Sequence, residues 1–374
     1  MDTIDKINDI RLYLQNTFKE RTDVIEGLLT ALVAQVHVLL IGAPGTAKSA
    51  ITVTLASLIE GFDYYQWLMT KFTTPEELFG PYDLQKLKAG AYERMTAGRL
   101  PVAHMAYLDE LFKANSAILN ALLTLINERV FYNGTRKETS PLQTLIGTSN
   151  EYPQEEELQA LFDRFLLRYE PGYIKEDGNF AAMLMHSSEQ PPAPITAMEL
   201  EQLQQESSRV PVESHVVDAI VTLRSDLVQE GIVLSDRRWV QVTKRILPAR
   251  AVLAGRRHIV IEEDAEILQH VLWEDPSQKA TVAMIVRKRL DPVAGQVAEL
   301  LEDARDIANT AMKASDEQAV PLGTEAIKKL KSIRSEVQAF IGAGGTPAKR
   351  QKIQEADAKI EEFLKGVTRK CLGI

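Results

Sequence analysis

Cysteine is almost missing from this chain, in which Cys371 is the single one among 374 residues. A disulfide cannot form within the chain, so a disulfide-stabilised secreted domain is excluded and a reducing compartment is favoured. A long apolar run is missing as well, because the most apolar stretch, residues 28–41, is short and contains Gln35 and His37. The first residues also lack the basic and apolar regions of a signal peptide. We therefore expect a cytoplasmic protein without a membrane span.

Positive charge is in deficit: 43 Lys and Arg stand against 52 Asp and Glu, which gives a formal net charge of −9. Proteins that bind nucleic acid along their surface are usually basic, so we do not expect a nucleic-acid partner, although this charge is compatible with a local basic groove. Hydrophobic residues make up 45% and charged residues 25% of the chain, which is ordinary for a globular protein with a sizeable core. The length predicts roughly two to three domains.

The first half of the chain alternates between helical and strand patterns. Apolar residues at helical spacing predict helices, and short apolar runs that end in polar residues predict buried strands. The expected elements, in order, are helices over 5–18 and 23–34, a strand over 36–42, a helix over 49–59, a strand over 103–110, a helix in the first half of 116–138, a hairpin turn at Asn133-Gly134 and a strand over 142–150. This alternation predicts an α/β fold with a parallel sheet between helices.

The second half of the chain is expected to be helical. The stretch SSEQPPAP, residues 187–194, is polar and proline-rich and predicts a linker. Beyond it, residues 195–275 show helical patterns and no persuasive strand. Long polar helices are expected over 293–314, 324–341 and 347–367. We divide the chain into an αβα core over 1–190, an all-α region over 191–276 and a C-terminal helical region over 277–374.

The stretch GAPGTAKS follows the first expected strand and fits a phosphate-binding loop, whose pattern is G-x-x-x-x-G-K-[ST]. In such loops, backbone N–H groups and the N-terminus of the next helix bind phosphate. Lys48 would reach the β- and γ-phosphates of ATP, and the Ser49 hydroxyl would bind Mg²⁺. The candidate nucleotide-binding residues are Gly42, Ala43, Pro44, Gly45, Thr46, Ala47, Lys48 and Ser49. A chance glycine turn between a strand and a helix is the alternative.

One position departs from that pattern, because Ala47 stands where glycine is usual. Ala47 lies where the following helix is expected to begin, and at a negative φ angle its methyl group would be tolerated. We therefore expect a working loop, on the condition that the φ angle of Ala47 is negative.

Polar residues end the next two expected strands. Asp109 and Glu110 follow one apolar run, and a nucleotide-bound Mg²⁺ needs an acidic anchor in addition to Ser49. Asp109 fits that role, and Glu110 would orient or deprotonate the attacking water. Asn150 ends the other run and would hold the same water against the γ-phosphate. The alternatives are an ordinary acidic pair at a strand end and a turn or cap residue.

Two arginine pairs are candidates for neutralising charge on the transferring phosphoryl group. Arg164 and Arg168 are expected on one helical turn, and an arginine there would be supplied across a subunit boundary. Arg237 and Arg238 lie beyond the linker, and an arginine there would reach back to the phosphates. Ordinary ion pairs at the surface, for example with Asp163, are the alternative for each of them.

Taken in order, the lysine loop, the strands that end in Asp-Glu and Thr-Ser-Asn, and the DRF and SDRR stretches resemble an AAA+ ATPase. The variant GxPGxAKS is similar to the MoxR family, and TTPEELFGPYDL and LFDRFLLR closely resemble its regulatory ATPase variant A (RavA) branch. The resemblance covers roughly residues 17–273 and implies a P-loop core, an all-α lid, and ATP and Mg²⁺ as cofactors. The implied roles are Walker A for Gly42, Gly45, Lys48 and Ser49, Walker B for Asp109 and Glu110, sensor 1 for Asn150, arginine finger for Arg164 or Arg168, and sensor 2 for Arg237 or Arg238.

The resemblance also implies how such a protein acts. The family forms hexameric rings that hydrolyse ATP to remodel or mature a protein client, and it tends to act with a partner that carries a von Willebrand A domain. Residues 72–98 resemble the family's insert in its second helix, and the hairpin at Asn133-Gly134 resembles its insert before sensor 1. Both inserts would contact the client. The alternative function is a slowly hydrolysing scaffold whose nucleotide state regulates a partner.

The C-terminal region departs from the longer RavA members, which carry a further domain rich in strands. Only helical patterns are found here, with modest apolar stripes such as Ile327, Leu330 and Ile333. One interpretation is a small helical bundle packed on the lid. The other is an arm that docks a partner.

Overall fold

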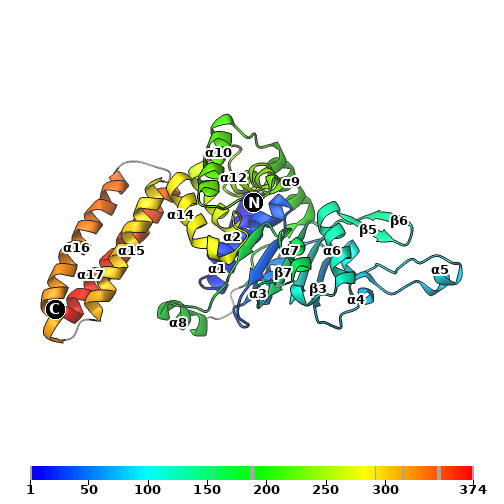
Figure 1. Cartoon of the computed structure of the whole chain (residues 1–374), viewed down its shortest axis with the longest axis horizontal. Coiled ribbons are helices and arrows are strands. Elements are labelled where there is room, and N and C mark those ends of the chain that lie inside the picture. Colours follow the sequence, from blue (N-terminus) through cyan, green and yellow to red (C-terminus); the bar gives the residue numbers. More distant parts are fainter. Residues whose placement is uncertain are drawn as a thin grey trace. The chain divides into compact units, whose positions relative to one another are not determined.

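The computed structural model describes residues 2–153, 155–185, 190–290, 292–313, 316–342 and 347–372. It divides into two compact units (Figure 1). The sheet unit comprises residues 1–214, 234–259 and 270–274, and the helical unit comprises 215–233, 260–269 and 275–374. The domain boundaries expected from the sequence stay a prediction. Residues 187–189 of the expected linker lie outside the described residues.

A five-stranded parallel sheet forms the centre of the sheet unit, in the order β3-β4-β7-β1-β8. Its strands are β1 (Val38–Ile41), β3 (Tyr64–Leu68), β4 (Met105–Asp109), β7 (Thr144–Ser149) and β8 (Leu167–Tyr169). Residues of β1 and β7 are buried throughout, as expected of strands covered on both faces. The register pairs Leu68 with Asp109 and Ile41 with Ser149, so the carboxyl ends of these strands meet at one edge. The predicted α/β fold is confirmed.

Helices such as α3 (Lys48–Ser57) and α6 (Ser116–Glu128) flank this sheet (Figure 1). The other helices of the sheet unit are α1 (Thr3–Thr17), α2 (Thr22–Ala34), α4 (Pro75–Phe79), α5 (Leu84–Lys88), α7 (Glu156–Phe162), α8 (Asp177–Met185), α9 (Ala197–Arg209), α11 (Asp236–Gln241) and α12 (Leu247–Leu253), with short turns η1 (Leu100–Val102) and η2 (Leu111–Lys113) and the π-helical η3 (Val242–Ile246). The Asn115 side chain caps α6 by accepting a hydrogen bond from the amide of Ile118 (3.2 Å). This helix ends at Glu128, and Arg129, which follows it, has a φ angle of +56°.

Two expectations about local structure were wrong. Residues 195–275 contain a strand after all, because β9 (Ile195–Thr196) pairs in parallel with β2 (Ile59–Glu60). Such a two-residue strand is too short to produce an alternating pattern in the sequence. Arg168 does not share a helical turn with Arg164, since it lies inside β8. The apolar residues around Arg168 complete a buried edge strand beside β1.

The predicted hairpin is present as β5 (Val130–Asn133) and β6 (Arg136–Thr139), with Gly134 at a φ angle of +62°. It contacts the segment 72–98 directly. The Asn133 side chain accepts a hydrogen bond from the Arg94 amide (2.6 Å) and donates one to the Arg94 carbonyl (3.1 Å). Figure 1 shows α5 and the hairpin extending to the same side of the sheet. The hairpin and the segment 72–98 are therefore joined by direct hydrogen bonds.

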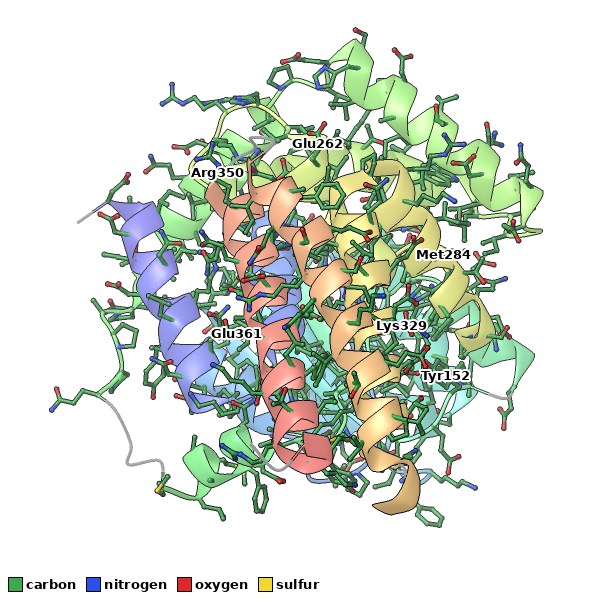
Figure 2. The ribbon with its side chains drawn as sticks, turned by 90° about the vertical axis from the view of Figure 1, so that its left-hand side faces the viewer. Tyr152, Glu262, Met284, Lys329, Arg350 and Glu361 are labelled. Atoms are coloured by element: carbon green, nitrogen blue, oxygen red, sulfur yellow. The ribbon has the colours of Figure 1, made fainter. Side chains whose placement is uncertain are left out.

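The helical unit contains α10 (Ser214–Gln229), α13 (Ile261–Asp264), η4 (Ala265–His270), η5 (Pro276–Gln278), α14 (Lys279–Leu290), α15 (Pro292–Met312), α16 (Asp316–Gly342) and α17 (Pro347–Leu372). The last three form a bundle with its own core, which includes Leu330, Val337 and Ile360. Arg334 on α16 pairs with Asp357 (2.8 Å) and Glu361 (2.9 Å) on α17. Figure 2 shows Lys329 on α16 and Glu361 on α17. The predicted C-terminal helices are confirmed, although α16 begins well before the expected Thr324.

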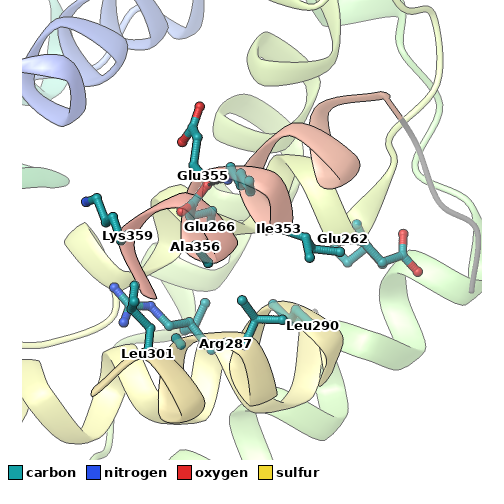
Figure 3. A pocket seen from close by; sticks show the side chains of 14 residues that line it. Glu262, Glu266, Arg287, Leu290, Leu301, Ile353, Glu355, Ala356 and Lys359 are labelled. Carbon is teal, nitrogen blue, oxygen red and sulfur yellow. Dashed lines mark hydrogen bonds and ion pairs between the residues drawn. The ribbon is translucent and has the colours of Figure 1, made fainter. Parts of the chain in front are cut away.

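A groove of about 410 Å³ lies where α17 meets α14 and α15 (Figure 3). Its floor is apolar, with Leu290, Leu301 and Ile353, and an ion pair between Lys352 and Glu266 crosses its rim. None of the helices in the described part of the chain is long and apolar enough to cross a membrane.

Candidate active site

The phosphate-binding loop, residues 42–49, connects β1 to α3 at the carboxyl edge of the sheet. The Gly42 amide donates a hydrogen bond to the Ser149 carbonyl (3.0 Å), which ties the loop to the end of β7. Gly45 has a φ angle of +80°, a conformation that glycine adopts without strain. Lys48 is only 8% exposed, and its amine donates to the carbonyls of Gly42 (2.5 Å) and Ala43 (2.9 Å). The lysine therefore lies folded over the loop.

The expectation for Ala47 was wrong, because its φ angle is +67°. This is the left-handed region, which explains why glycine is usual at this position. A Cβ atom there costs roughly 1–2 kcal/mol. Strain of this kind is characteristic of functional loops whose surroundings fix the backbone. Position 47 thus has a backbone conformation that favours glycine, although alanine occupies it.

Replacing Ala47 with glycine is expected to stabilise the free chain by about 0.5–1 kcal/mol. Relief of left-handed strain exceeds the extra entropy that glycine has in the unfolded chain. The midpoint of urea unfolding measures this, with Ala56→Gly inside α3 as the matched control. That control is expected to destabilise by about 1 kcal/mol, because Ala56 lies in a helix. If both variants lose the same amount of stability, the loop conformation is not strained.

Glu110 and Asn150 lie together beside Lys48. The Asn150 side chain donates to a Glu110 carboxylate oxygen (2.5 Å) and accepts from the Lys48 amine (3.4 Å). Glu110 has a φ angle of +54°, which turns the chain at the end of β4. Partial burial lowers the pKa of Lys48, and the carboxylates of Asp109 and Glu110 oppose that shift. Residues from three separate motifs therefore lie together at the carboxyl edge of the sheet, namely Lys48, Asp109, Glu110 and Asn150.

The two expected Mg²⁺ ligands lie on one side of β4. The Ser49 hydroxyl is hydrogen-bonded to the Tyr107 hydroxyl (2.7 Å), and the Tyr107 hydroxyl is 3.3 Å from that of Thr148. Thr148 in turn donates to the Asp109 carboxylate. A hydroxyl and a carboxylate joined by this short network suit a hard cation that prefers oxygen ligands. The residues present therefore fit Mg²⁺.

Tyr107 and Thr148 were missed by the sequence analysis. Strand alternation gives a signal for Tyr107, because residues two apart on β4 point to the same face and Asp109 was already a candidate. Burial raises the pKa of Tyr107, so its hydroxyl stays protonated and can donate a hydrogen bond near neutral pH. No pattern in the sequence pairs Thr148 with Asp109.

A cavity of about 570 Å³ adjoins the loop. Its lining combines loop residues such as Gly45 with the aromatic rings of Phe18, Tyr173 and Phe180. The Tyr173 hydroxyl donates to the Pro44 carbonyl (3.2 Å), so this wall is tied to the loop. Aromatic rings beside a phosphate-binding loop are suited to the flat base of a nucleotide. The sequence analysis did not identify this cavity, because its walls come from segments far apart in the chain.

The candidate arginines lie at the other edge of the sheet. Arg164 and Arg237 line a pocket of about 140 Å³ together with Gln35 and His37, which directly precede β1. Lys48 follows the opposite end of that strand. The structure therefore does not bring Arg164 or Arg237 to the phosphate-binding loop of the same chain.

Arg168 and Arg238 are buried, with 1% and 2% exposure. The Arg168 guanidinium donates to the carbonyls of Phe165 (2.9 Å) and Trp273 (2.5 Å). Arg238 donates to the Trp273 carbonyl (2.9 Å) and pairs with Asp163 (2.5 Å). Both guanidinium groups are therefore engaged within the protein interior. Of each pair of candidates, Arg164 and Arg237 are the more accessible.

Comparisons with known proteins agree with this arrangement. Residues 5–205 match the family described as the MoxR domain in the MoxR-vWA-beta-propeller ternary systems, and residues 215–286 match an AAA lid domain. Two uncharacterized proteins of Methanocaldococcus jannaschii are each 38% identical to this chain. One match spans 310 residues, 82% of this chain and 80% of that protein, and the other spans 309 residues, 82% of each.

Two more distant similarities concern a MoxR protein and the fold. Chaperone MoxR1 of Mycobacterium tuberculosis is 29% identical over 155 residues, which are 40% of each chain. A crystal structure of a candidate ATPase from Cytophaga hutchinsonii superposes with a TM-score of 0.61, covering 76% of this chain and 94% of that one. Its sequence identity is 20%, so this likeness supports the fold alone.

Proposed function

Because this chain belongs to the MoxR family of AAA+ proteins, we propose that it is an ATPase that hydrolyses ATP in a hexameric ring to remodel a protein client. The observation that supports this most is the convergence of Lys48, Asn150 and Glu110 at the end of β1, next to Ser49 and Asp109. A ring ATPase needs all of these groups at one phosphate chain. The similarity to the RavA branch stays a finer prediction.

Each residue has a definite role in this proposal. Lys48 exchanges its carbonyl acceptors for phosphate oxygens, because a charged acceptor makes the stronger hydrogen bond. Ser49 and Asp109 hold Mg²⁺, which supplies charge neutralisation at the phosphates. Glu110 accepts a proton from water, and Asn150, already bonded to that carboxylate, keeps it and the water oriented.

Arg164 and Arg237 act on the nucleotide of a neighbouring chain in this proposal. They lie at the edge of the sheet opposite to Lys48, where their own nucleotide is out of reach. An arginine supplied by a neighbour stabilises charge that develops on the transferring phosphoryl group. This makes assembly a condition of turnover.

The client would contact the joined inserts. Their surface exposes large apolar side chains, which soluble proteins usually bury or use for binding. These are Phe72 (91% exposed), Leu84 (70%), Tyr92 (66%), Met95 (53%) and Tyr132 (56%). The matched family is described by its systems with a vWA and a β-propeller protein, which supports a partner with a von Willebrand A domain. A cytoplasmic location and the absence of a nucleic-acid partner remain part of the proposal.

Lys48→Ala is expected to weaken ATP binding by roughly 100-fold, because one charge-assisted contact to phosphate contributes about 1.5–3 kcal/mol. Isothermal titration of the full chain with Mg-ATP measures the affinity. Lys244→Ala, at an exposed position on η3, is the matched control and should bind like the unaltered chain. Unchanged affinity of Lys48→Ala would contradict the nucleotide site.

A further inference from the structure

We propose that Arg129 and Arg245 complete an anion site with Arg164 and Arg237, and that this site takes the phosphate chain of a nucleotide held by a second copy of the protein. Through Arg129, occupation of the site is transmitted to the β5–β6 hairpin. This inference rests on the proposed function, since it adds residues to the same shared site. Neither Arg129 nor Arg245 carries a motif of its own.

The charge of the pocket is the first observation. Five arginines line it, Arg129, Arg164, Arg237, Arg238 and Arg245, and Asp163 is the carboxylate among the lining residues. Arg238 and Arg164 both pair with that aspartate (2.5 and 2.9 Å), which leaves the remaining guanidinium charges uncompensated inside the pocket. Like charges held this close are unfavourable without an anion.

His37 does not supply further positive charge there. Burial, together with the nearby Arg129, holds the pKa of His37 well below its usual range. Its Nδ1 accepts a hydrogen bond from the Leu145 amide (3.0 Å), and its Nε2 lies 3.3 Å from the Ile126 carbonyl. The histidine is therefore a neutral wall of the pocket, and its charge is determined by the five arginines and Asp163.

Unused hydrogen-bond donors are the second observation. Arg129 Nη1 and Arg164 Nε are buried and have no hydrogen-bond partner in the described part of the chain. Arg245 makes long contacts with the carbonyls of Ala34 (3.4 Å) and Gln35 (3.5 Å). Buried donors without acceptors cost free energy, and phosphate oxygens are the acceptors that match several guanidinium groups at once. A chain of phosphates is thus the ligand that this pocket fits.

Arg129 also stands at the base of the hairpin. It directly precedes β5, and its carbonyl accepts a hydrogen bond from the Ser140 amide (2.7 Å) on the other side of the hairpin. Its Nη2 donates to the carbonyls of Gln35 (3.0 Å) and Gln143 (2.8 Å). A phosphate bound at Nη1 would displace the Arg129 side chain, and the backbone of Arg129 closes the base of the hairpin. The hairpin in turn carries Asn133, which contacts Arg94 in the segment 72–98.

The test uses inorganic triphosphate and full-length Lys48→Ala, whose own phosphate-binding loop is disabled. Titration at low ionic strength is expected to show binding, and Arg129→Gln and Arg245→Gln in this background should each weaken it about tenfold or more. Arg209→Gln, at an exposed position on α9, is the control and should leave the affinity unchanged. Arg129→Gln also removes the hydrogen bonds of Arg129 to two backbone carbonyls and could therefore impair folding. In that case Arg245→Gln alone tests the anion site.

Amide hydrogen exchange over residues 130–139 tests the transmission. Triphosphate should slow exchange there in Lys48→Ala and leave it unchanged when Arg129→Gln is added. No triphosphate binding to Lys48→Ala, or binding that both arginine variants retain, would overturn the inference. Neither readout requires ATP turnover, so these results are separable from a failure of the proposed ATPase activity. If triphosphate binds as expected but ATP on a second chain does not promote association, free phosphate chains and not a neighbour's nucleotide would be the ligand, which contradicts the shared site.

Discussion

Glu110→Gln is expected to lower the ATP turnover number by roughly 10²–10⁴-fold while ATP affinity stays within about twofold. The Glu110 carboxylate accepts a hydrogen bond from Asn150 and lies within electrostatic reach of Lys48, which places it where the attacking water would be. Glutamine keeps the size of the side chain but cannot accept a proton. Steady-state phosphate release gives the turnover number, and titration of the variant with Mg-ATP gives the affinity.

Glu230→Gln is the matched control, because Glu230 is exposed and belongs to the helical unit. It should leave both quantities unchanged. Unaltered turnover in Glu110→Gln would favour the alternative function, a nucleotide-switched scaffold in which hydrolysis is slow and incidental. A parallel loss of affinity would instead show that Glu110 holds the nucleotide in its ground state.

Arg164→Ala is expected to lower turnover by about 10³-fold or more, again with ATP binding retained. Its guanidinium pairs with the neighbouring Asp163 (2.9 Å) and lines the pocket at the edge opposite to Lys48. Assays should be run at concentrations where the unaltered chain is fully assembled. Arg209→Ala is the control for loss of a surface arginine. If Arg164→Ala turns over ATP normally in assembled particles, the arginine is an ordinary ion-pair residue.

The sheet and its phosphate-binding loop were predictable because both depend on local patterns. A buried strand requires a short apolar run, and β1, β4 and β7 each have one. The run of β1 leads into the glycine loop, and those of β4 and β7 end in polar residues. In a parallel sheet these ends meet at one edge, which is why Lys48, Glu110 and Asn150 could be grouped before their contacts were known. The hairpin was equally accessible, since Asn133-Gly134 is a strong turn signal.

The remaining features depend on tertiary packing. The left-handed conformation of Ala47 follows from the path of the loop, whereas alanine by itself prefers a negative φ angle. Arg168 appears in the sequence as an accessible cation, yet carbonyls of Phe165 and Trp273 make it part of the core. Sequence spacing also gave no indication that Arg237 lies at the edge away from Lys48, because that depends on where α11 packs.

The most direct measurement of the shared site is a mixing experiment with Lys48→Ala and Arg164→Ala chains, each inactive alone. If one chain binds ATP and its neighbour supplies the arginine, mixed assemblies contain interfaces in which both groups are intact, and turnover should rise above that of either variant. Analytical ultracentrifugation should confirm that the two variants co-assemble. Co-assembly without any recovery, at every mixing ratio, would contradict the account.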